Sequence, residues 1–539
     1  MLFSILLALL NGALIGTSRA INGQLSTRKG AFGASVWNHV VGFVFLTAVL
    51  LVLHTWPDAS DVPLAAYVGG VFGALFVAVN SYVFPRLGAM NAAVLVISGQ
   101  VLSAVAIDCV QQRSLPAPVR LAGVALVLLG LCLPRLTSQR GKKGDPALSE
   151  RELIDDLLDD RTYHIEFNGH LTNHAKHAVV ALAGLGVPAR DIKAYYDDYA
   201  KLTSYGYGLE PPKPDRHTIT EENWRRHLGQ RTSFWSYCDF FDQRERELGL
   251  DEVLRRYVPE LLPGWTGAFT HATIHLGWAL DVGHRWMAIE GLAYMAFSYA
   301  TCHPERALPS TGKDASPADS LLRLAAEWEE RRDELAHWVA ETLADTSPVD
   351  RGEIHPELLR SGLQFRIART LSEGHPLFYD TPAWVEGSDD VWEPLYYAVT
   401  LLYLSQPADF VLLHLITSLH AMEQIALRLP EDVRRDAVRC FWIGLLGTVF
   451  SGGGFPRRAK LAALHELFAH AVDGGSKEED WSTIVSRAVI EEEEHNPKLV
   501  HVLRRVWARS GRRAVFRVAA GQFTATPDLP PSFEEPPTA

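Results

Sequence analysis

The chain is poor in cysteine and in strand-like patterns, and both absences narrow its fold class. Five cysteines occur in 539 residues, none of them in a CxxC spacing, so neither a disulfide framework nor a zinc finger is expected, and a reducing compartment fits. Alternation of apolar and polar residues is nearly absent, which disfavours a β-rich fold. No HExxH motif occurs, so a zincin site is unsupported. The net charge of −12 argues against nucleic acid as a partner.

Long apolar runs are confined to the first 136 residues. Most of them approach the ~20 residues that a helix needs to cross a bilayer. They cover residues 2–15, 36–53, 64–83, 89–107 and 121–133. The first run lacks a basic n-region and four more runs follow it, so it is not a cleaved signal peptide. We predict a five-helix transmembrane domain over residues 1–136.

Basic residues lie mainly on one side of the five predicted spans. The other side carries only Arg113 and Arg120. The richer side carries Arg19, Arg28, Lys29, Arg86, Arg135, Arg140, Lys142 and Lys143. By the positive-inside rule, the residues after 136 are cytoplasmic and the amino terminus lies outside. The sequence therefore predicts a multi-pass protein of the cell inner (plasma) membrane, embedded in lipid.

Two polar residues at predicted membrane depth are candidates for a transport pathway, Gln100 and Asp108. An ionisable group at the bilayer centre costs ~3 kcal/mol or more, so such a group is usually functional. The alternative is that Asp108 lies in water at the membrane interface, beside Gln111.

The membrane part resembles the short five-helix members of the drug/metabolite transporter superfamily. The likeness rests on Asn11, Gly12 and Gly16, on Asn22-Gly23, and on the patterns at 30–35 and 99–108. It implies a small-molecule exporter that assembles as a homodimer, because one copy has too few helices to enclose a pathway. A simple membrane anchor is the alternative.

The remainder of the chain is predicted to be a linker, a helical domain and a tail. Residues 137–150 are polar and basic, as in a linker. Apolar residues recur every three or four positions over 151–523, which predicts one large all-α soluble domain. Its acidic start, Asp155–Asp160, is expected to be a solvated helix face rather than a magnesium site. The Pro-rich residues 524–539 are predicted to be disordered.

Histidines at helical spacing mark this domain, which holds nineteen of the 21 in the chain. His174 and His177 lie three positions apart, and His271 and His275 lie four apart. On a helix each pair projects from one face, as two metal ligands or a ligand and its supporting neighbour would. The alternative is that each is a hydrogen-bonded core residue.

Three further segments carry histidine. His414 and His420 are six residues apart, about 240° around a helix, so at most one of them faces a shared site. His465 and His470 are five apart and face the same limit. In the last segment, Asn496 and Pro497 are predicted to be a helix N-cap and first helical residue, which places His495 and Lys498 at a helix entrance.

Four blocks in this order resemble the questin oxidase family: residues 173–186, 267–280, 409–421 and 493–503. The resemblance implies a cytosolic, mostly helical oxidoreductase that acts on anthraquinone-type aromatic polyketides. The implied reaction is a dioxygen-dependent, Baeyer–Villiger-like ring opening with NADPH as reductant. No GxGxxG follows a strand, so no Rossmann-type NADPH site is visible in the sequence.

Some members of that family resemble non-haem iron oxygenases with four histidines and a carboxylated lysine. By this resemblance, His174 or His177, His271 or His275, His414 and His495 would bind Fe(II) together with Lys498. His414 and Lys498 are the expected catalytic residues. The main interpretation is thus a membrane-tethered oxidase fused to an exporter-like domain. The alternative is a transporter whose helical domain senses substrate without catalysis.

Overall fold

Two helices make up nearly all of the described N-terminal unit in the computed structural model of this chain. α1 (Leu2–Leu53) bends at Gly30, where φ is 74°, and α2 (Leu64–Leu87) contacts it. Ser26 Oγ donates to the Ser81 carbonyl at 2.7 Å, and Ser35 Oγ donates to the Ala74 carbonyl at 2.8 Å. The second half of α1, Gly30–Leu53, is 24 residues long and apolar enough to cross a membrane.

The structure describes residues 2–54, 64–87, 96, 99, 103, 150–309, 314–386, 391–474, 477–490 and 493–523. The first three predicted spans fall in α1 and α2, and α1 joins two of them across the Gly30 bend. The fourth and fifth spans, with Gln100 and Asp108, lie almost entirely outside the described residues. Within those residues, one helix meets both the length and the apolarity needed to cross a membrane, so the five-helix prediction stays a prediction.

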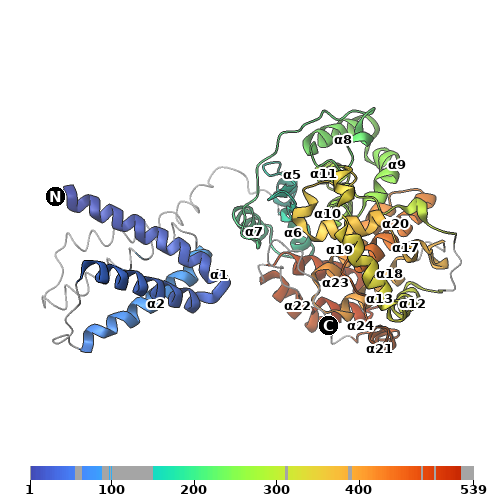
Figure 1. The fold of residues 1–539 in the computed structure, drawn as a ribbon. Coiled ribbons are helices and arrows are strands. Elements are labelled where there is room, and N and C mark those ends of the chain that lie inside the picture. Colours follow the sequence, from blue (N-terminus) through green and yellow to red (C-terminus); the bar gives the residue numbers. More distant parts are fainter. Residues whose placement is uncertain are drawn as a thin grey trace. The chain divides into compact units, whose positions relative to one another are not determined.

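The chain divides into two units, Met1–Pro146 and Ala147–Ala539. The second unit is helical, as predicted, and Figure 1 shows its elements. Its first helices are α5 (Glu150–Asp159), α6 (Ala175–Gly184), α7 (Ala189–Lys201), α8 (Phe234–Leu248), α9 (Leu250–Leu261), α10 (His271–Val282), α11 (Arg285–Phe297), α12 (Pro317–Glu330) and α13 (Arg332–Ala344). They continue as α14 (Ser347–Asp350), α15 (Leu358–Ser361), α16 (Leu363–Glu373), α17 (Pro376–Tyr379), α18 (Trp392–Ser405), α19 (Phe410–Ala426), α20 (Glu431–Phe450), α21 (Arg458–Phe468), α22 (Glu478–Ile490), α23 (His495–Arg509) and α24 (Ala514–Ala520).

Among the described residues, the one sheet is a two-stranded hairpin that leads into α6. β1 (Glu166–Phe167) pairs antiparallel with β2 (Leu171–Thr172). Asn168 and Gly169, both with positive φ, form the turn between them. Asn-Gly is a favoured pair for such a turn because both residues tolerate left-handed backbone. The hairpin sets the start of α6, two residues after β2.

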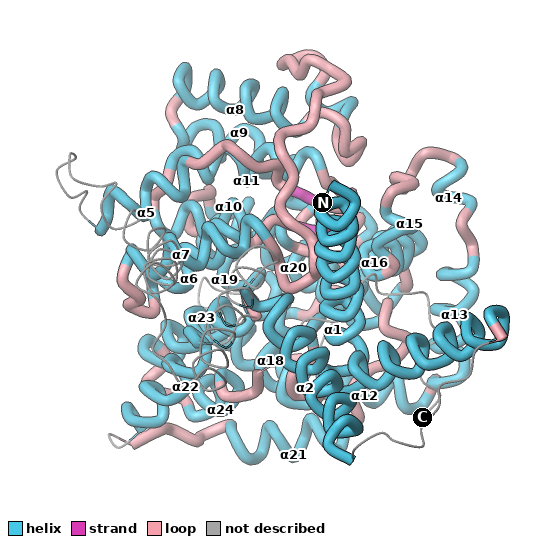
Figure 2. The backbone as a smooth tube through the Cα atoms, turned by 90° about the vertical axis from the view of Figure 1, so that its left-hand side faces the viewer, coloured by secondary structure: helices cyan, strands magenta, loops and turns pink. Residues whose placement is uncertain are grey.

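The buried centre of this unit is built from α10, α11, α19 and α23. α10 and α11 carry apolar residues on nearly every face and are buried almost throughout, as expected for core helices. Figures 1 and 2 both show α10, α19 and α23 between α8 at one end of the unit and α21 at the other. α10 crosses α19 at Gly277, where an added Cβ would lie 2.3 Å from the Ala421 backbone. The absence of a side chain there lets the two helices approach closely.

The acidic helix α5 confirms the prediction of a solvated face. Asp155, Asp156 and Asp159 are exposed, and Leu157 and Leu158 are buried beneath them. Asp160 is half-buried and accepts hydrogen bonds from Thr162 and Tyr196. The carboxylates therefore point to solvent, not to an apolar cavity.

Candidate metal centre

Four helices of the C-terminal unit bring four imidazoles into a closed ring. His174 immediately precedes α6, His271 begins α10, His414 lies on α19 and His495 begins α23. Going around this ring, the centroids of neighbouring imidazoles are 4.6 Å apart (His174–His271) and 4.8 Å apart at the other three steps. None of the four residues is more than 5% exposed. Each residue lies in a different block of the sequence, so only the folded chain assembles the ring.

A strained turn just before α10 positions His271 in this ring. Ala268, Phe269 and Thr270, the three residues before α10, all have left-handed φ, of 49°, 52° and 68°. Left-handed backbone costs roughly 1–2 kcal/mol for each non-glycine residue, and such strain gathers at functional sites. The turn brings the Ala268 carbonyl within 2.6 Å of His271 Nδ1. Because a carbonyl only accepts, Nδ1 must carry the proton.

Hydrogen bonds from Nδ1 leave an unprotonated Nε2 on each of three rings, those of His271, His414 and His495. His414 Nδ1 donates to the Phe410 carbonyl at 2.7 Å, and His495 Nδ1 donates to the Glu493 carboxylate at 2.5 Å. Burial holds the pKa of His271, His414 and His495 well below its usual range, so these rings are neutral. In a neutral imidazole whose Nδ1 is protonated, Nε2 carries a lone pair. Three Nε2 lone pairs therefore lie in one buried place.

These lone pairs have no proton to share. His271 Nε2 and His414 Nε2 lie 3.0 Å apart, and two lone pairs at that distance repel each other. His495 Nε2 is buried and has no hydrogen-bond partner. His174, His271 and His495 each offer one nitrogen within 4.8 Å of the others. A cation among these nitrogens satisfies all of them, so the donor set fits a metal ion.

Lys498 completes the set from the first turn of α23. Its Nζ lies 3.0 Å from His174 Nδ1, and the residue is 1% exposed. Burial lowers the pKa of Lys498 to about 8, although Glu494 and Glu493 act in the opposite direction. A substantial fraction of this amine is therefore neutral near pH 8, unlike an ordinary lysine.

His177 and His275 form a second layer behind the ring. His177 Nδ1 lies 3.4 Å from His174 Nδ1, and its Nε2 lies 3.0 Å from His275 Nδ1. His275 Nε2 lies 3.3 Å from Glu290. Because the carboxylate accepts, His275 Nε2 carries the proton and His275 Nδ1 accepts one from His177. Of each predicted pair, His174 and His271 lie in the ring, and His177 and His275 support it.

An ion pair terminates this second layer. Lys176 Nζ donates to Glu290 Oε2 at 2.6 Å, and both side chains are at most 8% exposed. Burial alone would raise the pKa of Glu290, but Lys176 and His275 lower it. A cavity of about 10 Å³ adjoins Lys176, His275 and Glu290, room for about one water molecule. The Glu290 carboxylate therefore stays ionised, and it determines which nitrogens of His275 and His177 carry a proton.

The other predicted histidines lie elsewhere. His420 Nε2 lies 3.2 Å from Asp281, whose carboxylate also accepts from Arg505 at 2.8 Å. His465 contacts the Tyr397 hydroxyl at 3.0 Å, and His470 lies beyond the end of α21. The group Asp281, His420 and His501 also has metal-ligand spacing, but the guanidinium of Arg505 already neutralises its carboxylate.

The predicted start of the last helix is wrong by two residues. α23 begins at His495, with Glu494 rather than Asn496 at the N-cap position. Glu493 Oε2 accepts from the backbone N–H groups of His495 and Asn496, at 2.8 and 3.2 Å. The carboxylate thus takes over the role that the sequence pattern assigned to Asn496.

Sequence reasoning missed the aromatic wall and the carboxylates of the site. Phe269 and Phe410 stand 4.4 and 4.6 Å from the His414 ring, and Phe410 is also 4.8 Å from His495. Phe410 is only half-buried, so it lies between the ring and the surface. A lone acid in the apolar stretch around Glu290, and Glu493 beside His495, were the available signals.

Comparisons with known proteins find relatives of both parts of the chain. A family model described as questin oxidase-like matches residues 171–503, and the model of the YdcZ inner membrane exporter matches residues 3–133. Oxidoreductase AflY of Aspergillus parasiticus is 30% identical over 154 residues, which is 26% of this chain and 29% of that protein. Baeyer-Villiger oxidase AgnL3 of Paecilomyces divaricatus is 28% identical over 142 residues, 24% of this chain and 29% of that protein.

The chain thus spans less than a third of the length of these two curated relatives. The family model, by contrast, covers more than half of the chain and includes all four histidines of the ring and Lys498. We conclude that this chain belongs to the questin oxidase-like family of oxidoreductases and carries an exporter-like domain at its amino-terminal end.

Proposed function

We propose that His174, His271, His414 and His495, with Lys498, hold a ferrous ion, Fe(II). The observation that carries this proposal is the convergence of unprotonated Nε2 atoms, two of them 3.0 Å apart and a third without a partner. Four imidazoles and one oxygen donor suit ferrous iron and leave a coordination position for a substrate.

The oxygen donor in this proposal is a carbamate on Lys498. A neutral lysine amine adds carbon dioxide and releases one proton, and the carbamate that results is an anion with two oxygen atoms. The buried amine has a pKa of about 8, so the reactive neutral form is accessible near neutral pH. A negative donor also offsets part of the ion's charge in a site whose other four ligands are neutral.

The second layer, His177 and His275, fixes the orientation of the His174 ring. His177 is tied through His275 to the ionised Glu290, so the His177 ring presents its bare Nδ1 toward His174. Such carboxylate-supported chains fix the orientation of a ligand ring, and mutations in them typically cost 10–100-fold in metal affinity or activity.

The reaction we propose is a Baeyer–Villiger-like ring opening of an anthraquinone-type aromatic polyketide. One oxygen atom of dioxygen enters the bond between a ring carbonyl carbon and its neighbour. The other atom leaves as water, formed with the hydride of NADPH, which carries two electrons and one proton, and with one proton from solvent. Water then hydrolyses the resulting lactone, which opens the ring to a carboxylic acid and a phenol. A ferrous ion, when bound, would supply the dioxygen activation. Phe410, which is half-buried beside the ring of histidines, offers a face on which a planar aromatic substrate stacks.

The location of the activity follows from the amino-terminal domain. We infer that the exporter-like domain tethers the oxidase to the inner membrane with the enzyme in the cytoplasm, as a homodimer. It would then export the ring-opened product.

The binding site of NADPH is not of the Rossmann type in the part of the chain that the structure describes. The one sheet among the described residues is the β1–β2 hairpin, whereas a Rossmann-type site needs a parallel sheet.

Oxygen uptake tests this function directly. The detergent-solubilised full chain, loaded with Fe(II) without air, should consume dioxygen when a hydroxyanthraquinone and NADPH are added, and should release a product with a cleaved central ring. His420→Ala, which lies outside the ring of imidazoles, is the matched control and should behave like the wild type. Tight binding of the anthraquinone without oxygen uptake would favour the non-catalytic sensing domain instead.

A further inference from the structure

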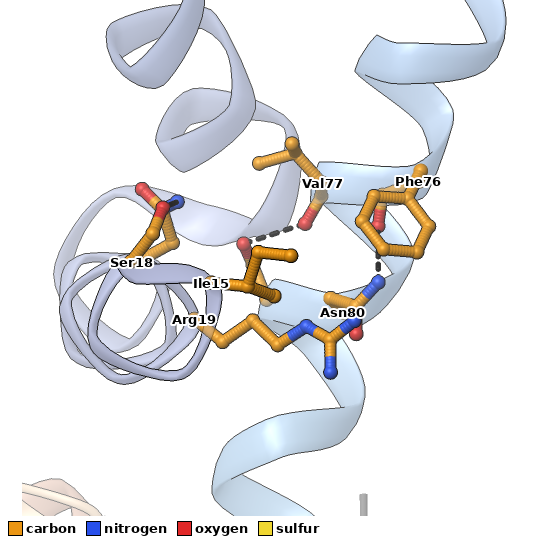
Figure 3. A pocket seen from close by; sticks show the side chains of 8 residues that line it. Ile15, Ser18, Arg19, Phe76, Val77 and Asn80 are labelled. Carbon is orange, nitrogen blue, oxygen red and sulfur yellow. Dashed lines mark hydrogen bonds between the residues drawn. The ribbon is translucent and has the colours of Figure 1, made fainter. Parts of the chain in front are cut away.

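A second cavity lies in the N-terminal unit, between α1 and α2. Its volume is about 250 Å³, and its lining includes Ser18, Arg19 and Asn22 from α1 and Phe76, Asn80 and Ser81 from α2. Figure 3 shows the Arg19 side chain reaching from α1 across the cavity toward Asn80. The volume falls just below the ~300 Å³ at which pockets for drug-sized ligands begin, so the cavity suits a molecule of one or two rings.

Arg19 is the charge in this cavity, and no carboxylate answers it among the described residues. Its Nε is buried and has no hydrogen-bond partner. The described part of the N-terminal unit contains no aspartate or glutamate at all. A buried guanidinium N–H group that lacks a hydrogen-bond partner is costly, here just beyond the first predicted span. An anionic ligand would supply the partner that this guanidinium lacks.

The other groups in the cavity suit an aromatic ring and a polar head. Phe76 lies with its ring centroid 5.5 Å from the Arg19 guanidinium carbon, so one ligand can touch both. The hydrogen bonds of Asn22 to Ser18 and Asn38, at 3.3 and 2.8 Å, fix the α1 side of the lining. Asn80 donates to the Phe76 carbonyl at 2.8 Å, which fixes the α2 side. The lining is therefore preorganised around the guanidinium.

We propose that this cavity binds an aromatic carboxylate, with the carboxylate paired to Arg19 and the ring against Phe76. Arginine holds a carboxylate through two parallel N–H donors, which gives both affinity and orientation. The proposal also deepens the proposed function and in that respect rests on it, because oxygen insertion beside a ring carbonyl gives a lactone, and hydrolysis of that lactone yields an aromatic carboxylic acid and a phenol. The site would then receive the product of the C-terminal unit.

Binding to the full chain in detergent tests the proposal. The probes are 2-benzoylbenzoate, a two-ring carboxylate, and its uncharged methyl ester, each measured by calorimetry. Saturable binding of the carboxylate is expected, with affinity reduced roughly tenfold or more in Arg19→Gln and retained within a few-fold in Arg19→Lys. Arg190→Gln, which removes an arginine that is 88% exposed in the other unit, should leave binding unchanged.

Ile15→Trp supplies a second variant that fills the cavity without changing its charge, and it should also abolish binding. Unchanged affinity in Arg19→Gln or Ile15→Trp, no saturable binding in the wild type, or equal affinity for the ester would each overturn the proposal. Bound iron and oxygen uptake are measured in the same samples. Their loss without loss of carboxylate binding would count against the oxidase function alone, and the reverse against the cavity alone.

Discussion

His271 on α10 and His414 on α19 are 143 residues apart in the sequence, and their Nε2 atoms face each other at 3.0 Å. Each ring donates a hydrogen bond from its Nδ1 to a backbone carbonyl, at 2.6 Å for His271 and 2.7 Å for His414. Neither Nε2 therefore has a proton to offer the other. This pair is the observation that most directly supports the proposed metal centre.

The first prediction concerns this pair and its neighbour His495. His414→Ala and His495→Ala should each remove bound iron and oxygen uptake, because each deletes one donor from a buried set. Helical content should change little. Iron by mass spectrometry and far-ultraviolet circular dichroism measure the two effects. His420→Ala and His470→Ala are controls that should keep iron, and full iron in the His414 and His495 variants would contradict the assignment.

A second prediction concerns Lys498. Lys498→Ala should lose iron and activity, and short carboxylic acids should restore part of both by standing in for the carbamate. Bicarbonate labelled with ¹³C should give a carbamate signal in the wild-type protein. Lys201→Ala is the control, because that lysine is exposed on α7 and should give no change in the carbamate signal. An unaltered signal in Lys498→Ala would place the carbamate elsewhere.

The second layer behind the ring should matter less than the ring itself. Glu290→Gln removes the ionised end of the chain through His275 and His177, and we expect iron affinity to fall by roughly 10–100-fold rather than vanish. Competition with a chelator measures the affinity. Glu373→Gln, at a half-exposed carboxylate on α16, serves as the matched control. An affinity equal to the wild type in Glu290→Gln would show that the chain does not support the site.

A fourth prediction follows from the crossing of α10 and α19. Gly277→Ala places a methyl group 2.3 Å from the Ala421 backbone, so the helices must separate, at a cost of about 1–3 kcal/mol. Lower thermal stability and weaker iron binding are expected together, because His271 belongs to α10 and His414 to α19. Gly454→Ala, with no atom within 4 Å of the added carbon, should change neither. Tryptophan fluorescence reports on this unit, because all but Trp37 and Trp56 of the 14 tryptophans follow residue 146.

The C-terminal unit should lose stability in mild acid partly through His164. Burial lowers the pKa of His164 to about 4, whereas the unfolded chain has a value near 6.5. Between these values the unfolded state binds a proton that the folded state does not, so the contribution of His164 to the free energy of unfolding falls as pH drops from 6.5 to 4, by about 3 kcal/mol. His164→Gln should therefore show a shallower decline between pH 7 and pH 4.5 in denaturant unfolding. Parallel declines would refute this account.

Much of the helical architecture was accessible from the sequence because the pattern is local. Helical periodicity and the spacing of the histidine pairs depend on neighbours within one or two turns. The choice of His174 over His177, and of His271 over His275, was not accessible in the same way. It depends on how α6 and α10 rotate against α19 and α23, and on the left-handed turn at 268–270.

The parts that sequence reasoning missed are all long-range. Phe410 borders the ring because α19 begins next to the starts of α10 and α23, and Glu290 meets His275 across two helices. The cap of α23 was assigned to Asn496 because Asn-Pro is a common helix start. A carboxylate two residues upstream of His495 competes for the same backbone donors, and in the folded chain Glu493 takes them.

The iron content of the full chain, purified without chelators and without air, tests the central claim most directly. The account predicts about one iron per chain in the wild type, none in the double variant His271→Ala/His414→Ala, and one again in His420→Ala. Wild-type protein that takes up no iron when Fe(II) is added, or a double variant that keeps one iron per chain, would contradict the proposal that this ring of histidines is a metal centre.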